Sequence, residues 1–256
     1  MIYQTALVTG ASAGFGRETV LQLVSKGIKV VALARRLDRL QALQKECGAE
    51  FVHIVAIDLN DSVELERVLT SLPADFSEID ILVNNAGLAL GLSPAQDCSL
   101  QDWNQMIDTN IKSLVHVTRL ILPGMVLRNR GHIFNIGSVA GHTAYPGGNV
   151  YSASKAFVAQ FSKNLRVDLF GTALRVTDIQ PGAAETEFSL VRFSSDQSRA
   201  DSVYEGYQAL TAKDVVDSLI WILERPAHVN IDAIEVMPVA QSSAGLRVYK
   251  GTPRDA

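Results

Sequence analysis

Apolar segments of two kinds alternate along this chain, and that alternation restricts the fold more than any other feature. Short runs rich in Val, Ile, Leu and Ala have the length of strands and are apolar at successive positions, so both of their faces should be buried. Longer runs between them carry apolar residues at helical spacing. The expected strands are 5–10, 28–34, 51–59, 79–87, 131–138, 174–182 and 230–239, and the expected helices are 16–27, 36–48, 62–72, 100–128, 151–169 and 213–224.

Strands that alternate with helices and are buried on both faces predict a parallel sheet between two layers of helices. We therefore expect one doubly wound α/β domain of the Rossmann type over residues 1–256, with α/β/α layers around a seven-stranded sheet. An interruption of helix 100–128 is expected at Pro123. The polar stretch 181–207 is expected to be irregular, and about 182–207 of it to form a lid over a substrate.

Composition excludes several classes of function. The chain has 256 residues, 47% of them hydrophobic, and a net charge of -4, which argues against disorder and, without a basic run, against nucleic-acid binding. No apolar segment is long enough to span a membrane, and the N-terminus lacks the pattern of a signal peptide, so a cytoplasmic location is expected. Cys47, Cys98 and the histidines have no metal-ligand spacing, so no metal is expected.

A glycine-rich loop, "TGASAGFG", joins the first expected strand to the first expected helix. Glycines at this turn let the backbone approach a pyrophosphate, and the helix N-terminus supplies N–H donors. A simple tight turn is the alternative, but the position in an alternating chain favours dinucleotide binding. The expected cofactor contacts in this loop are Gly10, Ser12, Ala13, Gly14, Phe15 and Gly16.

The second expected strand ends at two arginines, Arg35 and Arg36, and no acid stands there. Sites for NAD usually place an acid at this point to bind the ribose hydroxyls, whereas an arginine accommodates the 2′-phosphate of NADP. These arginines could instead be a solvated first turn of the next helix, but that turn disfavours positive charge. The sequence therefore favours NADP(H) as the cofactor.

Polar and small residues follow the carboxyl ends of three other expected strands, where ligands bind in sheets of this kind. Each position alone could be a turn or a helix cap. The further cofactor contacts expected there are Asp58, Leu59, Asn85, Ala86, Gly87, Pro181, Gly182 and Thr186.

Ser138, Tyr151 and Lys155 form the pattern S-x₁₂-Y-x-x-x-K. Residues four apart share one face of a helix, about 6 Å apart along its axis, so the charge of Lys155 is expected to lower the pKa of the Tyr151 phenol. The pair would then be an acid-base group that works near neutral pH, with Ser138 donating to a substrate oxygen. By itself Tyr-x-x-x-Lys would more often be an ordinary amphipathic helix.

Taken together and in order, the glycine loop, "NNAG", Asn110, Ser138, "YSASK" and "PGAAET" resemble the short-chain dehydrogenase/reductase family over nearly the whole chain. The resemblance implies that Tyr151 is the general acid/base and that Lys155 lowers its pKa and holds the nicotinamide ribose. It implies that Ser138 orients the substrate, that Asn110 supports a proton-relay water, and that the protein is a homotetramer.

Segments such as "NNAGLALG", "GGNVYSASKAFVAQFS", "RVTDIQPG" and "TEFSLVRF" resemble the NADP-dependent 3-hydroxy acid dehydrogenases within that family. This resemblance implies oxidation of serine, allo-threonine or related small 3-hydroxy acids. "PGAAETEF" is one residue shorter than the "PGLVGGTEF" typical of the subgroup, and this loop bears on substrate choice. Reduction of neutral ketones, sugars or polyols, and a non-catalytic NADPH-binding regulator, are the alternatives.

A carboxylate that enters a closed pocket needs a partner, and the planar fork of an arginine can pair with both of its oxygens. Arg192 in the expected lid is the candidate partner for the carboxylate. It is equally well supported that Arg192 pairs with an acid such as Glu187 or is exposed to solvent. Gln241 is a second, weaker candidate contact, and His142 and Asn149 are as well placed to line the pocket as not.

Overall fold

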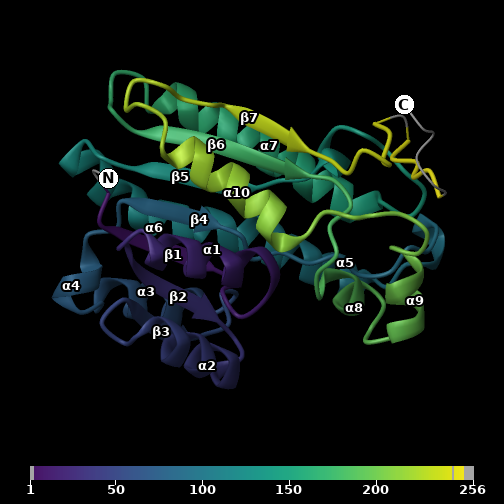
Figure 1. Cartoon of the computed structure of the whole chain (residues 1–256), viewed down its shortest axis with the longest axis horizontal. Helices are drawn as coiled ribbons and strands as arrows, with labels where there is room; N and C mark the ends of the chain where they lie inside the picture. The colour runs from purple at the N-terminus through teal and green to yellow at the C-terminus, as the bar shows by residue number, and fades with distance from the viewer. Residues whose placement is uncertain (1–2, 244, 251–256) are drawn as a thin grey trace.

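A computed structural model describes residues 3–243 and 245–250 of the chain. Its centre is a seven-stranded parallel sheet with the strand order β3-β2-β1-β4-β5-β6-β7. The strands are β1 (Thr5–Thr9), β2 (Lys29–Ala34), β3 (Val52–Ala56), β4 (Ile81–Asn84), β5 (His132–Ile136), β6 (Arg175–Pro181) and β7 (Ala233–Val236). The doubly wound seven-stranded fold expected from the alternating pattern is confirmed (Figure 1).

Helices cover both faces of the sheet (Figure 1). The main helices are α1 (Gly14–Ser25), α2 (Leu37–Cys47), α3 (Ser62–Thr70), α5 (Leu100–Ile107), α6 (Ser113–Arg128), α7 (Asn149–Asp168) and α10 (Ala212–Leu223). The shorter ones are α4 (Ala74–Ser77), η1 (Ala95–Asp97), the π-helical turn η2 (Asp108–Lys112), η3 (Val139–Gly141), α8 (Phe188–Arg192) and α9 (Gln197–Ser202).

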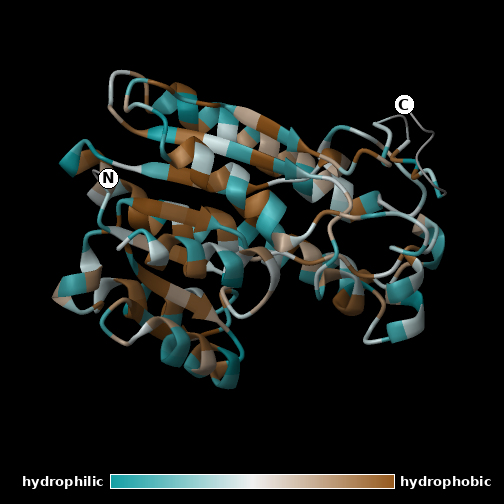
Figure 2. Cartoon of the chain, viewed as in Figure 1, coloured by the Kyte–Doolittle hydropathy of each residue, from teal (hydrophilic) through white to brown (hydrophobic). Residues whose placement is uncertain are grey.

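Two apolar cores lie on opposite faces of the sheet, as the strand pattern predicts. Successive residues of β1 alternate between them: Ala6 and Val8 pack with α1, α2 and α10, whereas Leu7 packs with α3, α6 and α7. The strands on the β1 side of the sheet are therefore mostly apolar on both faces, whereas β6 also carries buried polar side chains such as Asp178 and Gln180, and the helices show apolar and polar faces (Figure 2). Burial of these side chains at roughly 25 cal/mol per Å² is the main stabilisation of the three-layer arrangement.

The strand order reverses between β1 and β4, which are neighbours in the sheet. Ligands of open α/β sheets bind beyond the carboxyl ends of the strands at such a point. The turns after β1 and β4 both reach this edge, and α8 and α9 lie beyond it (Figure 1). The topology therefore brings the predicted site segments together.

Two expectations about local structure differ from what the structure shows. Helix α6 continues through Pro123, and the helical run from Leu100 to Arg128 instead changes geometry at η2, where Asn110 lies. Pro123 and Arg119, whose carbonyl loses its donor, are both exposed, so water can satisfy that carbonyl. The stretch 181–207 is irregular only in part, because it contains the short helices α8 and α9 between its turns. Asp196 caps α9 by accepting a hydrogen bond from the Arg199 N–H at 3.1 Å.

Candidate functional site

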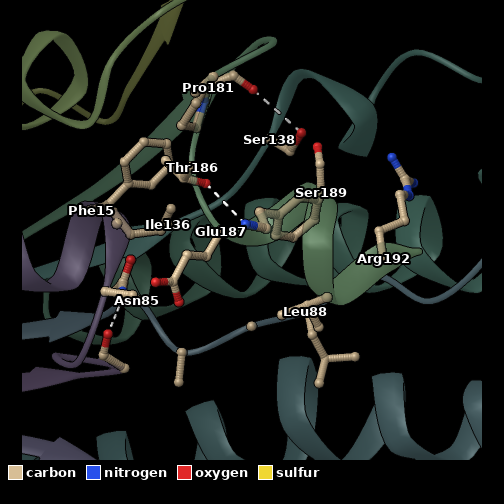
Figure 3. Close-up of a pocket in the computed structure, with 18 of the residues that line it drawn as sticks. Phe15, Asn85, Leu88, Ile136, Ser138, Pro181, Thr186, Glu187, Ser189 and Arg192 are labelled. Carbon is tan, nitrogen blue, oxygen red and sulfur yellow. Dashed lines mark hydrogen bonds between the residues drawn. The ribbon is translucent and has the colours of Figure 1, made fainter. Parts of the chain in front are cut away.

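A cleft of about 570 Å³ opens at the carboxyl edge of the sheet. Its lining includes every residue predicted to bind cofactor except Gly16, together with Ser138, Arg192 and Gln241; Asn110, His142 and Asn149 are not part of it. Figure 3 shows residues from the glycine-rich loop, β4, β5 and the segment after β6 facing the same space. Segments far apart in the sequence therefore supply one continuous cleft.

The glycine-rich loop is shaped by close backbone contacts. Gly10 has a φ of 67°, which favours glycine, and the Asn85 side-chain amide donates to the carbonyls of Thr9 at 2.8 Å and of Gly10 at 3.3 Å. A β-carbon on Gly16 would lie 2.3 Å from the Gly10 carbonyl oxygen. Gly16 thus faces the loop and not the cleft, and it allows helix α1 to begin directly behind the loop.

The arginines at the end of β2 differ in their surroundings. Arg35 lines the cleft, and the Arg36 guanidinium donates to the Ser12 hydroxyl from Nη2 at 3.1 Å. Arg36 Nη1 also contacts the Glu187 carboxylate at 2.8 Å, and Arg39 Nη1 contacts the other oxygen of the same carboxylate at 2.9 Å. Two guanidinium groups and a hydroxyl therefore gather at this end of the cleft, which suits an anion.

Tyr151 and Lys155 both lie on the buried face of α7, one helical turn apart. The Lys155 ammonium donates to the Ile136 carbonyl at 2.7 Å and lies 5.9 Å from the centre of the Tyr151 ring. The Ser138 hydroxyl donates to the Pro181 carbonyl at 3.4 Å (Figure 3), and it lies close enough to the Tyr151 phenol to act on its pKa. The three side chains converge as the S-x₁₂-Y-x-x-x-K pattern predicts.

The expectation that Lys155 lowers the pKa of Tyr151 does not match the structure. Burial raises the pKa of the phenol to about 12 and the nearby Tyr145 adds to this, whereas the Ser138 hydrogen bond and the Arg192 charge act in the lowering direction. Burial also lowers the pKa of Lys155 to about 8, against the opposing charge of Asp178. For both pKa values, removal of the group from water is the largest effect. The helical spacing of the two residues does not indicate this burial.

Asn110 lies in the π-helical turn, and its side chain is fully engaged there. Its Nδ2 donates to the Leu88 carbonyl at 2.8 Å and to the Ser154 hydroxyl at 3.0 Å, and its Oδ1 accepts from the Leu88 N–H at 2.8 Å. The side chain therefore fixes the chain after β4 beside α7. It does not reach the cleft, so its contribution to the site is positional.

Arg192 lies at the end of α8, and its guanidinium points into the cleft (Figure 3). Nη2 donates to the Tyr145 hydroxyl at 2.5 Å, and the guanidinium carbon lies 5.3 Å from the centre of the Tyr151 ring and 5.9 Å from that of Phe188. Nε is buried and has no hydrogen-bond partner within the described residues. A partly buried cationic donor thus lies next to Tyr151, and its prediction as an inward-facing side chain fits this geometry.

The short loop after β6 is held by the segment around Leu210 and by Gln241. The Glu185 N–H donates to the Leu210 carbonyl at 2.7 Å, and the Ala183 N–H donates to Gln241 Oε1 at 2.8 Å. Gln241 therefore positions the loop. His142 instead contacts Glu235 on β7, with Nε2 and Oε1 3.0 Å apart, and so points away from the cleft.

Three side chains contact this site without having been predicted to do so from the sequence. They are Arg39, Tyr145 and Glu187. Arg39 follows Arg36 by three residues, so helical spacing could have placed the two on one face of α2. Tyr145 lies in a loop and had no such signal.

Among the described residues, no three His, Cys, Asp or Glu side chains are grouped to hold a metal, and no helix is long and apolar enough to cross a membrane.

The chain is similar to known proteins over nearly its whole length. Residues 4–196 match the family model for short chain dehydrogenases. The NADP-dependent 3-hydroxy acid dehydrogenase YdfG of Salmonella typhi is 56% identical over 245 residues, which cover 95% of this chain and 98% of that protein. The serine 3-dehydrogenase of Agrobacterium fabrum is 47% identical over 246 residues, covering 96% and 98%.

Two solved structures have the same fold with substantial sequence identity. The closed form of a serine dehydrogenase complexed with NADP⁺ matches with a TM-score of 0.93 and 54% identity, covering 96% of this chain and 99% of that one. The serine dehydrogenase of Escherichia coli matches with a TM-score of 0.83 and 51% identity, covering 93% and 100%. The resemblance expected from the motifs is confirmed.

Proposed function

Because this chain belongs to the short-chain dehydrogenase family, we propose that it is an NADP-dependent oxidoreductase that reversibly oxidises the 3-hydroxyl of small 3-hydroxy acids. The relatives named for NADP-dependent action on 3-hydroxy acids and on serine support this assignment. The observation that carries the substrate class is the partly buried Arg192 guanidinium beside Tyr151, because a cation at that place suits a substrate carboxylate.

The cleft fits a dinucleotide phosphate by its own chemistry. A β-carbon on Gly10 or Gly16 would clash with Asn85, so these glycines let the loop pack tightly at the start of helix α1, whose N-terminal N–H groups suit a pyrophosphate. Arg35, Arg36 and the Ser12 hydroxyl would hold the 2′-phosphate, and Lys155 would hold the nicotinamide ribose. When bound, NADP⁺ supplies the hydride acceptor, and the protein supplies position and proton transfer.

We assign proton transfer to Tyr151, whose phenol faces the cleft next to Ser138. During oxidation the phenolate oxygen would accept the proton of the substrate hydroxyl, and during reduction the phenol would return it. Its raised pKa means that the phenolate needs stabilisation, which the Ser138 hydroxyl and the charge of Arg192 can supply. Asn110 keeps this arrangement in place through Leu88 and Ser154.

The carboxylate of the substrate would pair with Arg192. The donors for it are Nε, which has no partner in the described part of the chain, and Nη2, which is bonded to Tyr145, and an arginine fork can bind both carboxylate oxygens. Segment 182–207, which holds Arg192 and the short helices α8 and α9, would act as the lid over the substrate. From the resemblance alone, we also propose a cytoplasmic homotetramer.

An assay of NADP⁺ reduction across two groups of substrates tests this function. The first group holds both enantiomers of serine, allo-threonine, 3-hydroxyisobutyrate and 3-hydroxypropionate, and the second holds neutral alcohols of similar size. We expect turnover with members of the first group and much weaker turnover with the second. Preference for neutral alcohols would support a carbonyl reductase, and NADPH binding without turnover of either group would support a regulator.

A further inference from the structure

Glu187 contacts Arg36 and Arg39 at the end of the cleft that we propose for the 2′-phosphate. One carboxylate oxygen lies 2.8 Å from Arg36 Nη1 and the other lies 2.9 Å from Arg39 Nη1. The arginines come from the start of α2, whereas Glu187 comes from the segment just before α8. A side chain of the proposed lid is therefore bound to the residue that we expect to recognise the 2′-phosphate.

Glu187 and Arg192 extend from opposite ends of α8 (Figure 3). Arg192 lies over the Tyr151 ring, whereas the Glu187 carboxylate lies on the side of Asn85 and Phe15 (Figure 3). One short helix thus carries a cation toward the proposed substrate and an anion toward the proposed cofactor. A shift of this helix would move both groups together.

The charges in this cluster favour exchange of the carboxylate for another anion. Burial acts to raise the pKa of Glu187, but the hydrogen bonds and charges of Arg36 and Arg39 outweigh it and lower that pKa, so the group is ionised at neutral pH. The side chains of Arg36, Arg39 and Glu187 are 44%, 49% and 36% exposed. Ion pairs this open to water contribute little to stability, so an incoming phosphate can displace the carboxylate.

We propose that Glu187 is an internal competitor for the 2′-phosphate site and that Arg39 is a further ligand of that phosphate. This inference rests on the proposed use of NADP. Binding of the phosphate to Arg36 and Arg39 releases Glu187 and so frees the N-terminal end of α8 from α2. Without a 2′-phosphate, as in NAD, the carboxylate keeps its arginines. Glu187 therefore reduces the preference for NADP over NAD and links recognition of the phosphate to the position of the lid.

The test is direct binding of NADP⁺ and NAD⁺ to the full-length protein, measured by calorimetry for the wild type and Glu187→Gln. Loss of two half-exposed ion pairs predicts that the Kd for NADP⁺ falls by about 2- to 30-fold, with little change for NAD⁺. Glu185→Gln is the matched control, since Glu185 is exposed, lies two residues away and has no ion pair within the described part of the chain. The affinity of the Glu185→Gln variant for NADP⁺ should stay at the wild-type value.

Weaker NADP⁺ binding by Glu187→Gln would overturn the proposal, because it would make Glu187 a clamp that helps to hold the cofactor. If Glu185→Gln lowered the Kd for NADP⁺ by the same factor, the effect would come from net charge alone, which also refutes the proposal. Unchanged NADP⁺ binding by Glu187→Gln refutes the competition alone, whereas a wild-type protein that binds no NADP⁺ refutes the proposed function itself.

A second variant tests the role of Arg39. In the Glu187→Gln background, Arg39→Ala should raise the Kd for NADP⁺ by about 10-fold or more and leave the Kd for NAD⁺ nearly unchanged, as expected for loss of a charge-assisted hydrogen bond to the phosphate. Arg39 is half-exposed, so the fold should tolerate the change, and an unaltered thermal transition checks this. Equal Kd values for NADP⁺ with and without Arg39 would remove it from the phosphate site.

Discussion

Replacement of Arg192 by leucine should separate hydroxy acids from neutral substrates. The guanidinium is partly buried, and its Nε has no partner within the described residues, so it can form a charge-assisted hydrogen bond with a substrate carboxylate. Such bonds contribute about 1.5–3 kcal/mol each, so loss of one predicts an increase in KM for serine or 3-hydroxyisobutyrate of about 10- to 150-fold. Leucine keeps apolar volume against Phe188, and the backbone bond from the Gly91 N–H to the Arg192 carbonyl stays.

The assay is initial-rate NADP⁺ reduction with a 3-hydroxy acid and with a neutral alcohol of similar size. The KM for the acid should rise while the kinetic constants for the alcohol change much less. Arg192→Lys is a useful companion, since it keeps the charge but loses the fork, and it should lie between the wild type and Arg192→Leu. Parallel loss of activity on both substrates would refute the reasoning, because it would make Arg192 a structural residue of the lid.

Two further predictions concern the cofactor end and the buried lysine. The double change Arg35→Ala with Arg36→Ala should raise the Kd for NADP⁺ by about 10-fold or more and leave NAD⁺ nearly unaffected, and equal loss for both would indicate an effect on the fold. Lys155 has a pKa of about 8 in the fold against 10.5 when exposed, so the unfolded chain binds more protons between these values and the free energy of unfolding should rise with pH there, by about 3 kcal/mol. Denaturant unfolding of the wild type and Lys155→Met should show this rise only in the wild type, and parallel curves would contradict it.

The sheet could be predicted from the sequence because its signal is local. Runs with consecutive apolar residues, as in residues 5–10 and 28–34, indicate burial on both faces, and their alternation with helices leaves few topologies. The prediction of a break at Pro123 was wrong because the proline rule considers only the helix itself. Here the carbonyl of Arg119, which loses its donor, is on the solvent side, so the helix continues. The π-helical turn has no local sequence signal.

The site was predictable to the extent that its residues share an element or a motif. Tyr151 and Lys155 lie on one helix, so their spacing predicts that they point the same way. Their pKa values were not predictable from spacing, because burial depends on the whole fold and dominates both. The contact of Glu187 with Arg36 joins residues 151 positions apart, and no property of either segment indicates it.

The most direct test of the account is the substitution of Tyr151 by phenylalanine. The change removes the hydroxyl and keeps the buried ring that packs at 5.6 Å from Phe188. A group that transfers the proton contributes about 10²- to 10⁴-fold, so kcat with NADP⁺ and a 3-hydroxy acid should fall at least 100-fold while the Kd for NADPH stays near its wild-type value. If the variant kept more than about a tenth of the wild-type kcat, well outside that range, another group would be the acid-base catalyst and the central assignment would be wrong.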